Sequence, residues 1–229
     1  MLVFVLCQKK GRVSMAEIYN NYQITRLDAR GCFVESLFDA FPIGKIHLTF
    51  AKYDLSRPKG QRQTNNIQIY LSVDEFLELY RRLACGELRF QWQKKKENKD
   101  QTPLFSQLGG VSAEKLAKQG RARKDGKSLS RTVELMISDK GLMFIAKSGP
   151  GETTATGLIV PKFGNKPENH VVVSMDFEMF SKFILITHAH YQAWLASWYM
   201  QNPIQPAQRV QRPESVDVQE QNYVDTPMF

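Results

Sequence analysis

Four short runs near the start of the chain are typical of β-strands, and the third of them alternates apolar and polar residues as a half-buried strand should. Turn-forming residues separate the runs, which cover residues 24–27, 32–38, 45–50 and 66–71. The last run leads into Ser72 and Glu75, whose spacing is that of a capping box at the start of a helix. Apolar residues then recur at helical spacing to about Ala84. This part of the chain therefore predicts four antiparallel strands followed by one helix.

The same order of elements returns about a hundred residues later. Predicted strands cover residues 131–137, which alternate, and residues 142–147, 157–160 and 170–175, with turns predicted at 139–141, 148–151 and 163–167. Ser174 and Asp176 then repeat the Ser-(apolar)-Asp pattern of Ser72 and Asp74, and a long apolar segment continues to about Met200. We therefore predict an α+β fold built from two repeats of a four-stranded antiparallel sheet plus one helix.

This recurrence divides the chain into two repeats joined by a polar segment. The predicted segments are an N-terminal extension at 1–22, a first repeat at 23–88, a basic flexible linker at 89–130, a second repeat at 131–200 and a tail at 201–229. We predict that the tail is disordered, because proline and glutamine are frequent after Gln201.

The second predicted helix is apolar on nearly all of its sides. One stripe at helical spacing consists of Phe177, Phe180, Ile184, Tyr191, Trp194 and Trp198. A helix of this kind must be buried on more than one side. We expect it to pack on its own sheet and also on the first helix or on a second subunit, so the chain is a candidate homodimer. His188 and His190 on this helix are two residues apart, whereas helical metal ligands need a spacing of three or four.

Positive charge is concentrated between the two repeats. The whole chain has a formal net charge of +8, and residues 81–131 contain 14 Lys or Arg against five Asp or Glu. The rest of the chain is therefore close to neutral. A net positive charge favours polyanionic partners. The basic run is typical of a solvated linker, and it equally suits an arm that neutralises phosphate groups.

Sequence signatures of catalysis are missing. The chain has no Gly-Lys-Ser/Thr phosphate loop, no nucleophile elbow and no cluster of His and Cys at metal-ligand spacing. We therefore expect a protein that is not an enzyme and that uses no cofactor or metal. A metal-dependent nuclease stays open as an alternative, because such a site needs only a few scattered carboxylates.

Cysteine usage and hydropathy indicate the compartment. Cys7, Cys32 and Cys85 are scattered and odd in number, which favours a reducing environment, and we expect a cytoplasmic protein. No apolar run approaches the roughly 20 residues that a transmembrane helix needs, so no membrane partner is expected. Met15 offers a start as good as Met1, which makes residues 1–14 a candidate extension outside the fold.

One face of the first sheet is the predicted binding surface. Apolar residues of its third and fourth strands would point to the helix, which leaves Lys45, His47, Gln68 and Tyr70 on the opposite face. Cations suit the backbone of a single nucleic-acid strand, and aromatic rings let its bases stack. An aromatic residue on a sheet face is equally compatible with cross-strand packing. With the neighbouring loops and the basic linker, the candidate nucleic-acid-binding residues are Arg26, Arg30, Lys45, Tyr53, Arg57, Lys59, Arg62, Tyr70, Lys94, Lys95, Lys96, Arg121, Arg123 and Lys124.

The order of four strands and a helix, found twice over residues 23–200, resembles the single-stranded nucleic-acid-binding fold of the PUR and whirly proteins and of related transcriptional coactivators. The resemblance rests on the order of the elements. It implies that the sheets bind single strands and that the helices form the core or a dimer contact.

The C-terminal end is similar to the tip of bacterial single-stranded-DNA-binding proteins. A Gln/Pro-rich stretch leads to Asp225, Pro227 and the terminal Phe229. The resemblance implies that this tip recruits replication or repair proteins, with Phe229 in an apolar pocket and its carboxylate near basic residues. The bacterial tips carry consecutive aspartates, whereas Asp217, Glu220 and Asp225 are dispersed here.

One hypothesis and two alternatives follow from these patterns. We expect a non-enzymatic, largely sequence-independent single-stranded-DNA-binding protein of a bacterium or of a mobile element that it hosts. Its tail would recruit replication and recombination partners. A transcriptional regulator or RNA-binding module on the same fold is the first alternative. A protein-interaction subunit, whose basic segment meets an acidic protein, is the second.

Overall fold

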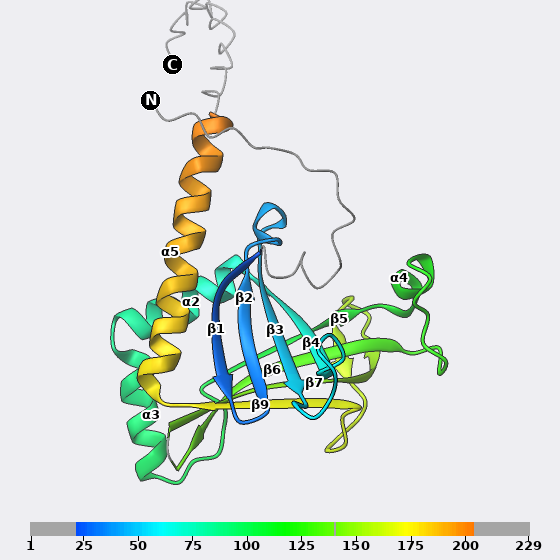
Figure 1. The fold of residues 1–229 in the computed structure, drawn as a ribbon, viewed down its shortest axis with the longest axis horizontal. Helices are drawn as coiled ribbons and strands as arrows, with labels where there is room; N and C mark the ends of the chain where they lie inside the picture. Colours follow the sequence, from blue (N-terminus) through cyan, green and yellow to red (C-terminus); the bar gives the residue numbers. More distant parts are fainter. Residues whose placement is uncertain (1–21, 140, 204–229) are drawn as a thin grey trace, which may run out of the picture.

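The computed structural model describes residues 22–139 and 141–203 (Figure 1). The strands are β1 (Gln23–Ala29), β2 (Cys32–Leu37), β3 (Lys45–Tyr53), β4 (Gln63–Ser72), β5 (Phe105–Val111), β6 (Ser128–Ser138), β7 (Gly141–Thr153), β8 (Ile159–Pro161) and β9 (Asn169–Met175). The helices are the short 3₁₀ helix η1 (Phe41–Ile43), α2 (Val73–Ala84), α3 (Glu87–Glu97), α4 (Ala113–Lys118) and α5 (Phe177–Gln201). The predicted α+β class is confirmed, with two antiparallel sheets of four and five strands.

The first sheet contains β1 to β4 in sequence order, with all neighbours antiparallel. These strands coincide with the four strands predicted from the sequence. Inward residues such as Val34, Leu48 and Ile69 belong to the hydrophobic core. At the start of α2, the carboxylate of Glu75 accepts the backbone N–H of Ser72 at 2.9 Å, which confirms the predicted capping box.

The second sheet is larger than predicted, because β5 adds a strand beside β6. β7 is 13 residues long, and the two parts of its other edge have different neighbours. Residues 142–148 pair with β9, and residues 151–153 pair with β8. The third strand expected in the second repeat is therefore only three residues long, and β9 lies next to β7 along most of the sheet.

The turn predicted at residues 148–151 is wrong, because these residues lie inside β7. The two glycines of this stretch are explained by packing instead. A Cβ atom on Gly149 would lie 2.8 Å from the ring of Phe163, and one on Gly151 would lie 2.9 Å from the side chain of Ile159. Close packing of two large side chains over the strand therefore requires glycine here, and the chain reverses only after β7 ends.

Residues 89–130 contain most of α3, all of β5 and all of α4, whereas the sequence predicted a flexible linker. Sparse apolar residues anchor this stretch to the sheets, and Leu104 and Leu116 are both 4% exposed. Trp92 of α3 also donates a hydrogen bond from its Nε1 to the carbonyl of Gly141 at 3.2 Å. The many lysines and glycines of this stretch are typical of a linker, and composition does not show which of its few apolar residues become buried against the sheets.

The two sheets pack against each other around one hydrophobic core that includes residues of both repeats. Phe50 of β3 meets Phe144 of β7 edge to face, with ring centroids 4.9 Å apart. The Sγ atom of Cys32 lies 3.1 Å from the carbonyl oxygen of Val172 in β9. Figure 1 shows the strands of the first sheet running across those of the second. Truncation of Phe50 to alanine would therefore destabilise both repeats, by about 3–5 kcal/mol.

The long helix α5 packs on the first sheet although it follows the last strand of the second. The hydroxyl groups of Ser36 and Thr187 are hydrogen-bonded at 2.8 Å in the interior, and Phe41 meets Tyr191 with ring centroids 5.3 Å apart. The C-terminal end of α5 projects beyond the sheets, and Met200 there is 85% exposed (Figure 1). Although α5 has 25 residues, none of the helices in the described part of the chain has the sustained apolar length of a membrane span.

Candidate functional site

A groove of about 680 Å³ lies between the two sheets, along β4 of the first and β5 of the second. Among the described strands, β4 pairs only with β3 and β5 only with β6, so both are edge strands. Figure 1 shows the two strands next to each other on the side of the molecule that carries α4. α4 and the segment that follows it line one part of the groove. The volume is within the range of about 300–1,000 Å³ that is usual for ligand sites.

Among the described residues, four basic side chains line this groove, against one acidic residue, Glu75. The basic residues are Lys45 of β3, Lys115 of α4, Arg131 of β6 and Arg121, which follows α4. Within the described residues, none of the four has a carboxylate oxygen inside the 4.0 Å limit of an ion pair. Desolvation lowers the pKa of Arg131, but an arginine stays protonated at neutral pH. Cations gathered in a concave surface focus a positive potential that attracts anions.

Tyr70 adds an aromatic surface to the groove. Its side chain is 44% exposed, although the residue lies inside a strand. Its ring stacks on the imidazole of His47, the residue opposite it on β3, with ring centroids 4.3 Å apart and 16° between the planes. Arg131 is near enough for its charge to interact with Tyr70. The groove therefore combines positive charge with an accessible ring.

A buried polar network lies beneath Tyr70. His47 is 2% exposed, and its Nδ1 atom lies 2.8 Å from a carboxylate oxygen of Asp39. Its Nε2 atom contacts Oε1 of Gln68, and the hydroxyl of Thr49 donates to the same oxygen at 2.8 Å. Both ring nitrogens thus have hydrogen-bonding partners, so the imidazole cannot rotate without breaking one of these contacts.

Gly109 and Gly110 form a part of the groove wall that has no side chains. A Cβ atom on Gly109 would meet nothing closer than the carbonyl oxygen of Arg131 at 3.9 Å. A Cβ atom on Gly110 would lie only 2.3 Å from the carbonyl oxygen of Leu129. The first glycine therefore keeps the groove open, and the second is required by the packing of the sheet.

Three of the predicted binding residues meet in the groove, namely Lys45, Tyr70 and Arg121. Lys115 and Arg131 were not among the predicted residues. Lys115 is one of many lysines in the basic segment, and Arg131 occupies a strand position like any other. No sequence signal separates them, because only the packing of the two sheets brings α4 and β6 beside β4.

The sheet face predicted to be exposed is largely buried. Thr49 is 1% and Glu35 is 7% exposed, and burial raises the pKa of Glu35. Arg26 lies on this face, where its guanidinium covers the ring of Phe33 at 3.6 Å and pairs with Asp28 at 2.6 Å. The side chains that line the groove at the edge of this sheet are therefore more accessible to a ligand than those at the centre of the sheet.

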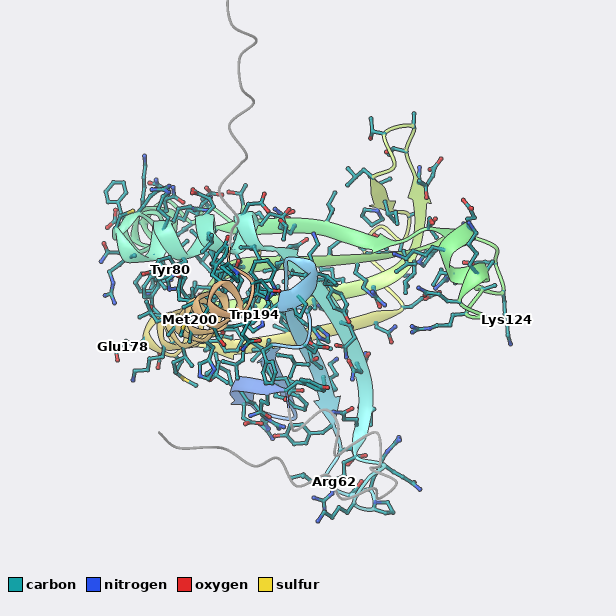
Figure 2. The ribbon with its side chains drawn as sticks, turned by 90° about the horizontal axis from the view of Figure 1, so that it is seen from above. Arg62, Tyr80, Lys124, Glu178, Trp194 and Met200 are labelled. Atoms are coloured by element: carbon teal, nitrogen blue, oxygen red, sulfur yellow. The ribbon has the colours of Figure 1, made fainter. Side chains whose placement is uncertain are left out.

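The remaining predicted residues lie in separate places. Figure 2 shows Arg62 and Lys124 at two different corners of the molecule. The predicted loop residues are Arg30, Arg57, Lys59 and Arg62, the predicted α3 residues are Lys94, Lys95 and Lys96, and Tyr53 ends β3. In Figure 1, α3 and α4 lie at opposite ends of the second sheet. The basic segment is thus divided in two, and it does not form one continuous arm.

Arg123 is paired within the protein. Its guanidinium lies 2.6 Å from Glu168 and 2.9 Å from Asp125. Hydrogen bonding to Arg123 holds the pKa of Asp125 at about 2, and it lowers the pKa of Glu168. These contacts connect the segment after α4 to the turn before β9.

Two further predictions concern metals and the tail. The described residues contain no group of three or more His, Cys, Asp or Glu that could hold a metal ion. The predicted tip residues Asp225, Pro227 and Phe229 lie outside the described residues.

Comparison with known proteins gives no family assignment. The sequence matches no protein-family model and no curated protein.

Proposed function

We propose that the protein binds a single nucleic-acid strand, and specifically single-stranded DNA, in the groove between β4 and β5. The observation that carries the proposal is that four cations without an ion pair among the described residues share one groove with an exposed tyrosine ring. Cations bind phosphates and aromatic rings stack on bases, which is the requirement of binding with little sequence preference. In this proposal, the protein binds nucleic acid and is not an enzyme.

An unpaired strand suits this groove better than a duplex. The bases of a duplex lie inside the stack, so Tyr70 could reach only an unpaired or flipped base. A groove of about 680 Å³ encloses only a short piece of a strand, and exposed cations outside it, such as Lys124, would hold the flanking phosphates.

The architecture also supports the proposed likeness to the PUR and whirly proteins. Two antiparallel sheets, each followed directly by a helix, are compatible with that fold. We propose in addition that residues 225–229 recruit replication or repair proteins. Deletion of these residues should leave DNA binding intact and abolish partner pull-down, whereas a loss of DNA binding would refute this role of the tail.

A second copy of the chain is the proposed partner of α5. Residues 183–202 contain no Lys, Arg, Asp or Glu, and Leu185, Ile186 and Tyr199 are exposed. Because the chain has a net charge of +8, an uncharged helix lets two copies approach with little like-charge repulsion. Sedimentation equilibrium should show a dimer for the wild type and a monomer for Ala193→Glu, and a monomeric wild type would overturn the proposal.

The main proposal is tested by binding labelled oligonucleotides over a series of salt concentrations. Single-stranded DNA should bind more tightly than duplex. The logarithm of the affinity should fall with the logarithm of the salt concentration, with a slope of about −3 from the four groove cations alone and a steeper slope where flanking cations also bind phosphates. Duplex binding that is equal or stronger would refute the proposal.

Two further outcomes would select the alternative functions. Stronger competition by RNA of the same sequence would indicate recognition of 2′-hydroxyl groups and an RNA-binding role. If no nucleic acid is retained at physiological salt, a protein-interaction role would be favoured.

A further inference from the structure

We infer that His47 is a positioning residue that fixes the ring of Tyr70 in the orientation needed for stacking on a base. The inference rests on the proposed single-strand binding in the groove. It concerns how the first sheet presents its one groove-lining aromatic ring.

Histidine is an unexpected residue at this position. His47 is 2% exposed, and a buried polar ring is unfavourable unless its nitrogen atoms are hydrogen-bonded. An apolar residue of similar size would fill the same space without needing partners. The polar network around His47 therefore has a role beyond filling space on the sheet.

The network holds the imidazole from two sides. On one side, Nδ1 lies 2.8 and 3.0 Å from the two carboxylate oxygens of Asp39. On the other side, Nε2 contacts Gln68, which also accepts a hydrogen bond from Thr49 and contacts Asn66. The plane of the imidazole is thus set by hydrogen bonds at both of its nitrogen atoms.

Stacking on the imidazole of His47 holds the ring of Tyr70 in nearly the same orientation. The two rings are 4.3 Å apart and within 16° of parallel, and they belong to directly opposed residues of neighbouring strands. Tyr70 is 44% exposed on an edge strand, and stacking on His47 reduces the rotamer freedom that its ring has to lose when a base binds. Because the ring is already held in place, its stacking on a base costs less conformational entropy. Gln68 lines the groove as well, so the clamp and the stacking surface share one wall.

Substitutions at His47 separate this role from phosphate binding. Tyr70→Ala should weaken the binding of single-stranded DNA about 5- to 150-fold, through loss of one base stack. His47→Leu keeps the volume but loses the planar ring and its hydrogen bonds, and should weaken binding about 2- to 10-fold because Tyr70 can leave its rotamer. His47→Phe keeps a ring under Tyr70 and should recover most of this loss. The salt slope should stay unchanged in all three variants, because the phosphate contacts remain.

A double-mutant cycle with a labelled oligothymidine decides the inference. If His47 acts through Tyr70, adding His47→Leu to Tyr70→Ala should weaken binding no further. An additional loss equal to that in the wild-type background would overturn the positioning role, and so would a His47→Leu variant that binds like the wild type. Should His47→Leu fail to fold, Asp39→Ala removes one side of the clamp at a side chain that is 32% exposed, and it enters the same cycle.

The proposed function and the positioning role can fail separately in this experiment. If the wild-type protein binds no single strand, the proposed function fails and the positioning role fails with it. If the wild type binds normally and the cycle is additive, only the positioning role is refuted.

Discussion

Two basic clusters on the α4 side of the molecule use their charge in different ways. The groove cluster consists of Lys45, Lys115, Arg121 and Arg131, and within the described residues none of these forms an ion pair. The Arg123 cluster consists of Arg123, Asp125 and Glu168, joined by ion pairs of 2.6 and 2.9 Å.

Arg121 and Arg123 are only two residues apart in the sequence, yet they belong to different clusters. A count of charges treats them alike. In the folded protein, Arg123 has already satisfied its donors with two carboxylates, whereas Arg121 lines a groove with its charge available to a ligand. The comparison teaches that pairing in the folded state, and not charge density along the chain, separates a candidate binding cation from a structural one.

The largest expected effect comes from removing charge from the groove cluster. The double variant Lys115→Ala with Arg121→Ala should weaken single-stranded DNA binding at least about 10-fold, because two charge-assisted phosphate contacts are lost. The salt slope should become shallower by about 1.4. Fluorescence anisotropy over a salt series measures both quantities. Lys94→Ala on the distant α3 is the matched control, and an equal change in that variant would contradict the assignment of the groove.

The two adjacent glycines of the groove wall should respond in opposite ways. Gly110→Ala should destabilise the fold by about 1–3 kcal/mol, because its Cβ would clash with the carbonyl oxygen of Leu129. Gly109→Leu should change stability by less than about 0.5 kcal/mol and still weaken DNA binding, because its side chain enters the open groove. Urea unfolding and DNA titration of both variants test this contrast. Normal binding by Gly109→Leu would exclude the groove as the path of the strand.

Removal of the central residue of the Arg123 cluster should affect stability and not binding. Arg123→Ala should lower the melting temperature by about 2–4 °C, because the segment after α4 loses its connection to the turn before β9. The salt slope of DNA binding should match that of the wild type. A shallower slope in this variant would mean that Arg123 leaves its carboxylates to bind phosphate, and the distinction between the two clusters would then be wrong.

The smallest expected effect is the pH dependence of the Arg123 cluster. The pKa of Asp125 is about 2 in the folded protein, below its usual value of 3.8, so the unfolded chain binds the proton more readily. The resulting stabilisation is present above about pH 4 and is lost as the pH falls towards 2. The lowered pKa of Glu168 acts in the same direction. Urea unfolding between pH 2 and 6 should show that wild type and Arg123→Ala converge at low pH, and a constant difference between them would contradict this origin.

The sequence alone predicted the elements that depend on local physics. Short strand-like runs between turn residues predicted the strands of the first sheet, and the capping box at Ser72 and Glu75 located the start of α2. The start of α5 was equally clear, because Asp176 accepts the N–H of Met179 at 2.7 Å. These features involve residues within a few positions of each other, so their pattern is visible before the chain folds.

The candidate site could be predicted only in part. Lys45, Tyr70 and Arg121 were expected to bind, but on an open sheet face and a flexible arm. The groove exists because β5, from the supposed linker, joins β6 and lies beside β4. Residues of β4 and β5 are separated by more than thirty positions, and no periodic pattern encodes which edge strands will meet.

By itself, therefore, the sequence determined that this protein has two strand-rich regions with helices and an excess of positive charge. Only the tertiary structure decided which charges stay unpaired, which aromatic ring reaches the surface and which glycines leave space. The physical reason is that pairing, burial and open volume are properties of residues from distant parts of the chain. They become defined only when the two sheets pack around their common core.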